Sequence, residues 1–162
     1  MRFLELLIAH CMEGFLIVGA GLGIMNIRPK LSKIACLALI YGFLIFAVRK
    51  FYIMYEIPFG THSFVLITLY AICLKYIGRQ NWAAAIIAPL ISFFLINIGE
   101  GMILYNGTKL LGITMEDIIH KPGFRLVGTI LTDVPLIIVF ITGYILNISV
   151  IDINRFTEKE DI

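Results

Sequence analysis

The sequence has few charged residues. Asp, Glu, Lys and Arg together make up 15% of its 162 residues, whereas apolar residues make up 60%, and the mean hydropathy is +0.96. Soluble domains carry about a quarter of their residues as charged side chains. This composition therefore excludes an ordinary soluble domain, and we predict a multi-pass protein of the cell membrane whose main partner is the lipid bilayer.

Cysteine is scarce, and catalytic and nucleic-acid motifs are lacking. The three cysteines, Cys11, Cys36 and Cys73, are far apart and lie in apolar segments, which argues against a disulfide framework or a Cys-rich metal site. The basic residues form no patch with interleaved aromatics, so we expect no nucleic-acid partner. No motif places a nucleophile beside a base. We expect a chain that is not an enzyme and has no cofactor.

The apolar residues gather in five runs that reach or approach the length a helix needs to cross a bilayer core of about 30 Å. In that core the backbone must satisfy its own hydrogen bonds, which favours helices. The predicted fold is all-α, a bundle of about five transmembrane helices in one domain of residues 1–152, with a polar tail at 153–162. The predicted helices cover residues 3–26, 31–48, 61–77, 82–105 and 125–151.

The connection between the fourth and fifth helices is longer than the others. Thr114 precedes Glu116 and Asp117, which is a typical helix start with acidic residues in the first turn, and Lys121-Pro122-Gly123 is a typical stop. We predict a short amphipathic helix here, lying at the membrane surface.

Five crossings would place the two ends of the chain on opposite sides of the membrane. Six basic residues fall on the side of the N-terminus and seven on the other side, so their number alone gives little orientation. The shorter and more densely basic loops lie on the second side. We therefore predict a cytoplasmic C-terminus.

Ionisable residues inside spanning helices are costly, and each is a functional candidate. Alternation of helix direction places all of these residues in the half of the membrane nearest the N-terminus. The candidates for ligand binding or sensing are His62, Glu100, His10, Glu13 and Asp133.

Each candidate also has a structural interpretation. His10 and Glu13 share a helix face and can pair with each other. Glu100, between two glycines, can lie at the interfacial end of its helix. Asp133, two residues before Pro135, suits the first position of a helix. No pair has the tight spacing of a zinc motif, so we expect no metal site.

Two further motifs favour structural roles. Gly19 and Gly23 are four residues apart in an apolar helix, and this spacing predicts packing against a neighbouring helix. The surrounding GAGLG is not a dinucleotide fingerprint, because no strand precedes it. In IPFGTHSF, Thr61 suits the N-cap of the third helix. His62 then lies one residue inside that helix, as either a helix-start residue or a sensing group.

The order of several segments resembles the N-terminal membrane region of Firmicutes sensor histidine kinases with a GHKL-type ATPase domain. The resemblance covers nearly the whole chain, and IPFGTH and LGITMED carry it most clearly. Its segments are IRPKLSK, VRKFYIMYEIPFGTHSFVLITLYAICLKY, SFFLINIGEGMIL and LLGITMEDIIHKPGFRL.

This resemblance implies a multi-helix input module that signals to a cytoplasmic kinase, usually as a homodimer. The sequence contains neither the phosphoacceptor helix pair nor the ATP-binding domain of those kinases, so we expect no kinase activity. It is then a stand-alone sensor, a truncated relative or one region of a longer receptor.

Three functions fit the sequence. The first is a signalling-input module that reads a small ligand or peptide at its polar end and passes a conformational change to the tail. The second is a small transporter or its substrate-binding membrane subunit, because transporters use intramembrane carboxylates and interrupted helices. The third is a structural partner in a membrane complex.

Overall fold

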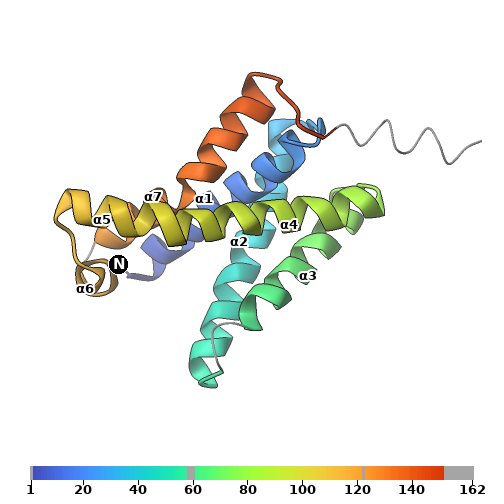
Figure 1. Cartoon of the computed structure of the whole chain (residues 1–162). Helices are drawn as coiled ribbons and strands as arrows, with labels where there is room; N and C mark the ends of the chain where they lie inside the picture. Colours follow the sequence, from blue (N-terminus) through green and yellow to red (C-terminus); the bar gives the residue numbers. More distant parts are fainter. Residues whose placement is uncertain (1, 58–60, 122, 152–162) are drawn as a thin grey trace, which may run out of the picture.

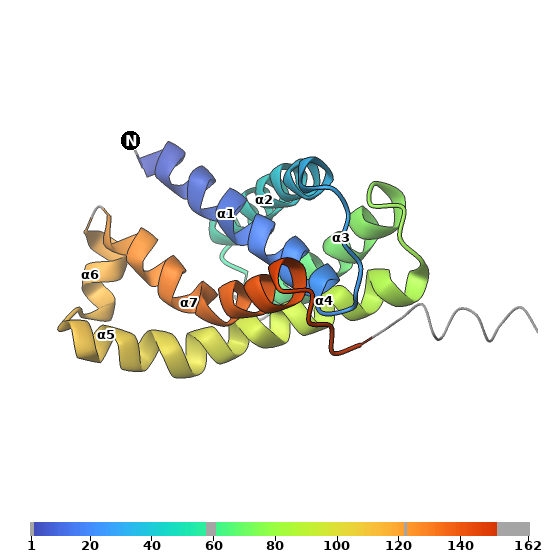
Figure 2. The same cartoon turned by 90° about the horizontal axis from the view of Figure 1, so that it is seen from above.

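The structure, a computed structural model, describes residues 2–57, 61–121 and 123–151. Every regular element in this part of the chain is a helix, so the all-α prediction is confirmed there. The predicted tail at 153–162 lies outside the described residues. Figure 1 shows that residues 82–111 form one long rod that lies across the other long helices. Figure 2 shows the same rod from above as a gently curved element along the lower edge of the view.

Four helices among the described residues are long and apolar enough to cross a membrane, rather than the five predicted. The exception is α3 (His62–Tyr76), whose 15 residues span only about 22 Å at 1.5 Å per residue. The four are α1 (Arg2–Gly23), α2 (Leu31–Met54), the rod formed by α4 (Trp82–Ile98), η2 (Gly99–Leu104) and α5 (Tyr105–Leu111), and α7 (Phe124–Phe140) with η3 (Ile141–Ile145).

Although α3 is short, it returns the chain along α2. Near its first residue, the ring of His62 packs edge-on against Tyr52, close to the end of α2, with 6.0 Å between the ring centroids. Just after its last turn, the Gly78 carbonyl accepts a hydrogen bond of 2.7 Å from Lys33 Nζ, near the start of α2. The two helices therefore run antiparallel, and the last turns of α2 extend beyond α3.

Two of the predicted helices are longer in the structure. The second continues past residue 48 to Met54, because Arg49 and Lys50 are good helix formers and do not end a helix. The fourth contains the wider π turn of η2 within its predicted range and continues past residue 105 to Leu111 as α5. It stops at Gly112, whose φ of +65° gives the left-handed C-cap that favours glycine.

Two other predicted helices end earlier than expected. The first stops at Gly23 rather than residue 26, because Asn26 takes a left-handed backbone with φ +61°. The fifth ends with η3 at Ile145 rather than at residue 151, and Asn147 has φ +62°. A left-handed residue cannot continue a right-handed helix.

The interpretation of Asp133 as a helix N-cap is wrong. The helix begins at Phe124, directly after Gly123 with φ +82°, and Pro135 lies inside it. Asp133 is therefore a mid-helix residue, and its carboxylate faces neighbouring helices. Thr61 does precede α3, but its hydroxyl makes no capping hydrogen bond and instead donates to Tyr52 Oη at 3.3 Å.

The short helix predicted between the last two long helices is present as α6 (Met115–His120). The Thr114 hydroxyl accepts a hydrogen bond from the Asp117 amide at 3.1 Å, and the Asp117 carboxylate accepts one from the Thr114 amide at 3.0 Å. Lys121 Nζ lies 2.6 Å from the same carboxylate. The Lys121 ammonium, followed by the contacts with Thr114, lowers the pKa of Asp117 to about 2.

Glycines allow α1 to approach its neighbours closely, as in helix pairs packed through small residues. A Cβ on Gly14 would lie 2.9 Å from the Ala38 carbonyl oxygen of α2, and one on Gly42 would lie 2.9 Å from the His10 carbonyl oxygen. Further along α1, Gly19 lies against the ring of Phe140, and Gly23 meets the backbone of Gly143 and Tyr144. The faces of α1 that pack on α2 and on α7–η3 therefore both depend on glycine.

The rod meets α7 at a still closer crossing. A Cβ on Gly99 would overlap the Thr132 carbonyl oxygen, whereas a Cβ on Gly101, two residues further, would meet nothing within 4 Å. The next residues along the two helices are Glu100 and Asp133. The crossing therefore fixes the backbone positions from which these two side chains extend.

The two glycines of η2 give a matched pair of variants. We expect Gly99→Ala to lower the stability of the protein by about 1–3 kcal/mol, because the rigid α7 backbone must move away from the new methyl group. We expect Gly101→Ala to be neutral or stabilising by up to about 1 kcal/mol. Thermal unfolding of both variants in the same detergent measures the difference, and equal stabilities would contradict the crossing.

Candidate functional site

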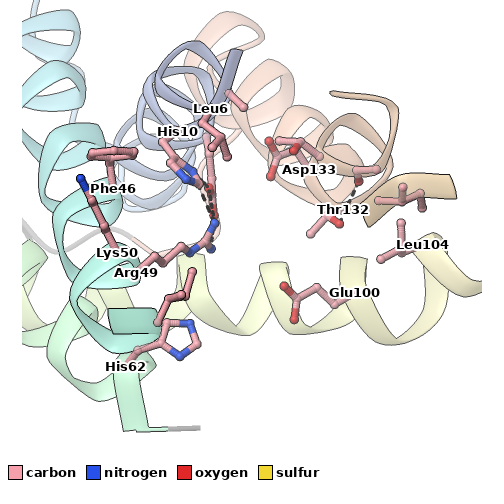
Figure 3. Close-up of a pocket in the computed structure, with 16 residues that line it drawn as sticks. Leu6, His10, Phe46, Arg49, Lys50, His62, Glu100, Leu104, Thr132 and Asp133 are labelled. Atoms are coloured by element: carbon pink, nitrogen blue, oxygen red, sulfur yellow. Dashed lines mark hydrogen bonds and ion pairs between the residues drawn. The ribbon is translucent and has the colours of Figure 1, made fainter. Parts of the chain in front are cut away.

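A cavity of about 740 Å³ opens near the N-terminal end of α1. Figure 3 shows the walls contributed by α1 and α2, by η2 below them and by α7 opposite. Its size is typical of sites for small organic ligands. The apolar lining includes Leu6, Ala9, Phe46, Ile53, Leu104 and Ile118, and the polar lining includes His10, Glu13, Arg49, Lys50, His62, Glu100, Thr129, Thr132 and Asp133.

The wall formed by α1 and α2 carries a partly buried ion pair. Arg49 Nη2 lies 3.2 Å from Glu13 Oε1, and Arg49 Nη1 lies 3.4 Å from Glu13 Oε2. His10 Nδ1 lies 3.2 Å from Glu13 Oε2 and 3.3 Å from Arg49 Nη1. His10 and Glu13 are each 7% exposed. The structure thus pairs His10 with Glu13, one of the two interpretations that the sequence allowed, and adds Arg49 to this pair.

Arg49 is the site residue that the sequence reasoning missed, because the predicted second helix ends at residue 48, just before Arg49 and Lys50. One signal was available. The buried face of α2 passes through Tyr41, Ile45 and Tyr52, and Arg49 falls on this helical repeat between the last two. The Gly14–Gly42 crossing then brings α1 close enough for Arg49 to reach Glu13.

Glu100 and Asp133 form the opposite part of the lining. Asp133 is only 3% exposed, whereas Glu100 is accessible. Within the part of the chain that the structure describes, neither carboxylate takes part in a hydrogen bond or an ion pair. Figure 3 shows both side chains directed toward the interior that they share with Arg49. Two carboxylates therefore face the cavity without a partner.

His62 reaches the cavity from the first turn of α3. It is half-buried, packs on Tyr52, and also lines a smaller cavity of about 70 Å³ that continues inward beside Glu13, Arg49 and Glu100. This smaller space is bordered by Tyr41, Ser63 and Asn97. Its volume is sufficient for water, which needs about 10–15 Å³ of such space per molecule.

The five candidates from the sequence all line the larger cavity. Direction alternation predicted that they share one end of the molecule, and the structure places them around a common space. Gly19 and Gly23 do not line it. They pack α1 against α7 and η3 further along the helix. Among the described residues, no group of three or more His, Cys, Asp or Glu side chains is arranged to hold a metal ion.

In the buried core, three hydroxyl groups donate hydrogen bonds to backbone carbonyls of neighbouring helices. Tyr41 Oη donates to the Leu66 carbonyl at 3.3 Å. Tyr70 Oη and Ser92 Oγ both donate to the Ile17 carbonyl, at 3.2 Å and 2.9 Å. These hydrogen bonds join α1, α2, α3 and α4 in the buried core, in addition to its apolar packing.

Comparison with protein-family models, with curated proteins and with solved structures yields no match to this chain. The functional argument therefore rests on the site itself.

We expect Glu13 and Arg49 to depend on each other. Removing one partner leaves the other charge unpaired in an apolar wall, so Glu13→Gln and Arg49→Gln should each lower stability by about 2 kcal/mol or more. The double variant should lose clearly less than the sum of the two single variants. A double-mutant cycle of unfolding free energies in detergent measures this coupling.

Lys50→Gln is the matched control, because Lys50 is the next residue on α2 but is exposed. It should leave stability within about 0.5 kcal/mol of the parent protein. Additive effects of the Glu13 and Arg49 changes would contradict a functional ion pair in the folded protein.

Proposed function

We propose that the chain is a multi-pass protein of the cell membrane. In the part of the chain that the structure describes, large apolar side chains are exposed along several helices. Examples, each at least 60% exposed, are Leu39, Phe43, Phe64, Phe94 and Leu110. Monomeric soluble proteins rarely expose apolar patches of this extent. Close helix crossings at glycine also suit a bilayer, where association relies on tight packing.

We place the C-terminal end of this membrane domain in the cytoplasm. The basic loops of one end are joined to each other and to η3. Arg28 Nε donates to the Gly143 carbonyl at 3.3 Å, and Lys33 Nζ donates to the Gly78 carbonyl. Short loops rich in Lys and Arg favour the cytoplasmic side. The cavity then opens toward the outer side.

Labelling of single cysteines tests this orientation in a background in which Cys11, Cys36 and Cys73 are replaced by alanine. An impermeant maleimide should label Leu110→Cys in intact cells, because this exposed residue of α5 lies at the outer end. It should label Val150→Cys only after permeabilisation. The reverse pattern would contradict the orientation, and accessibility of both from one side would contradict a spanning α7.

We further propose that the chain is a signalling-input module that works by a conformational change and not by catalysis. The observation that carries this proposal is the one-sided position of the cavity, with its ionisable lining gathered at the end opposite to η3. A ligand bound there would be detected at one end of the helices, and the other end would report it.

Two helices connect the cavity with the far end. Along α1, His10 and Glu13 line the cavity, whereas Gly19 and Gly23 pack on Phe140 and η3. Along α7, Asp133 lines the cavity and Phe140 follows two turns later. A change in how α1 and α7 cross at the cavity would therefore alter their contact near η3.

The far end also holds the segment that leaves the last helix. The Tyr144 hydroxyl donates to the Pro29 carbonyl at 2.6 Å. The amides of Val150 and Ile151 both donate to the Ile24 carbonyl, at 3.0 Å and 3.1 Å. The chain after η3 is thus attached to the α1–α2 loop. The resemblance to membrane regions of sensor histidine kinases adds support and suggests a kinase or a second copy of the chain as partner.

A transporter is the second candidate, and the small cavity beside Tyr41 and Asn97 favours it because it carries the polar space further inward. Beyond it, the hydroxyls of Tyr70 and Ser92 are bonded to the Ile17 carbonyl within a buried apolar cluster. This apolar, hydrogen-bonded layer supports sensing over transport. Uptake into proteoliposomes separates the two functions.

Coupling between the cavity and the far end can be tested without knowing the ligand. Spin labels on Leu39→Cys and Val150→Cys, in the same cysteine-free background and in nanodiscs, report the distance between α2 and the segment after η3. We expect the double variant Glu100→Gln/Asp133→Asn to shift this distance distribution, because it removes the repulsion that acts on the α7–η2 crossing. Glu116→Gln on α6 is the control. Identical distributions in all three proteins would contradict an input module.

A further inference from the structure

We propose that the cavity binds an organic ammonium ion, with the charged nitrogen held by Glu100 and Asp133. This inference deepens the proposed function, since it names the chemical class that the input module would detect. It rests on the charge distribution of the cavity and on the contacts of each charged group.

The interior of the cavity carries more carboxylic acid groups than guanidinium or ammonium groups, with the imidazoles of His10 and His62 beside them. Three carboxylates line it, those of Glu13, Glu100 and Asp133, against the single guanidinium of Arg49. Arg49 uses two nitrogens on Glu13, so its charge is already balanced. Lys50 also borders the cavity but is exposed, and Figure 3 shows its amine directed away from Glu100 and Asp133.

Asp133 makes this excess more than a surface cluster of acids. It is 97% buried, it lines the cavity from the middle of α7, and within the described residues its carboxylate has no hydrogen-bond or ion-pair partner. Buried ionisable groups are normally paired, because leaving them unpaired is costly. A cation entering the cavity would supply the missing partner of Asp133 and reach the accessible carboxylate of Glu100.

The shape and the walls indicate an organic cation rather than a metal ion. No described group of three His, Cys, Asp or Glu side chains is arranged for a metal. The space is many times larger than an ion and is bounded by Leu6, Ala9, Phe46, Leu104 and Ile118. An ammonium group attached to a hydrocarbon chain matches both parts, with its charge on the carboxylates and its carbon atoms on the apolar walls. An anion could reach the Arg49 guanidinium only by displacing Glu13.

Isothermal titration of the full chain in nanodiscs tests the proposal, with empty nanodiscs to subtract partitioning into lipid. The probes are hexylammonium, hexan-1-ol and hexanoate, which share a chain and differ in charge. We expect saturable binding of hexylammonium that is at least about tenfold tighter than binding of the other two. Equal binding of the alcohol, or tighter binding of hexanoate, would overturn the proposal.

Variants show whether the two carboxylates hold the ammonium. Asp133→Asn and Glu100→Gln should each weaken hexylammonium binding by about tenfold or more, since each removes a charged partner in an apolar site. Glu116→Gln, on α6 and outside the cavity lining, should leave it unchanged. Asp133→Glu keeps the charge and should retain most of the binding, which separates loss of charge from misfolding. Undiminished binding by both neutral variants would overturn the assignment.

Two further measurements distinguish the source of the ammonium and the function. A short peptide with one lysine is added in competition with hexylammonium. If the peptide displaces hexylammonium at a lower concentration than hexylammonium needs to bind, a peptide amine is the better ligand. No displacement would leave free amines as the class. Accumulation of hexylammonium in proteoliposomes would contradict the input module while supporting the ligand class. Binding of hexylammonium that leaves the Leu39–Val150 distance unchanged would also contradict the input module while supporting the ligand class.

Discussion

The ion pair between Arg49 and Glu13 is the interaction on which the arrangement of the helices depends. A carboxylate in an apolar helix is costly unless a cation and hydrogen bonds compensate it, and Glu13 is 7% exposed. Its compensation requires α2 to continue as a helix through Arg49 and requires α1 to pass close to α2. Gly14 and Gly42 permit that approach, and the cavity is the space that these helices leave against α7 and η2.

The same pair defines what the cavity can recognise. Arg49 is engaged with Glu13 and makes no hydrogen bond or ion pair with the described carboxylates of Glu100 and Asp133, and the Gly99–Thr132 crossing prevents these two from separating freely. Backbone packing thus holds the two carboxylates near each other against their mutual repulsion. Sites preorganised in this way bind a matching charge without first having to rearrange. The crossing is therefore as much part of the site as the carboxylates.

Much of this architecture follows from the sequence, and the exceptions have physical causes. Apolar runs located every long helix, and alternation of direction gathered His10, Glu13, His62, Glu100 and Asp133 at one end. The role of Arg49 escaped, because adjacent basic residues are typical of both a loop and a helix that extends past the bilayer. The continuation of the rod past residue 105 to Leu111 also escaped, since Asn106 and Gly107 suggest a helix end. Whether glycine ends a helix or allows a close crossing depends on what packs against it, and local sequence does not contain that information.

The one-sided distribution of charge also bears on how a signal would pass. An unpartnered carboxylate inside an apolar bundle raises the free energy of the arrangement that buries it, and a cation that reaches it lowers that free energy. A ligand shifts a conformational equilibrium only through such a difference between states. Asp133 lies on α7, which contacts α1 both at the cavity and again through Phe140 at Gly19. A change of charge at Asp133 therefore acts on a helix pair that extends from the cavity to the segment after η3, and we propose this buried carboxylate as the physical origin of the signal.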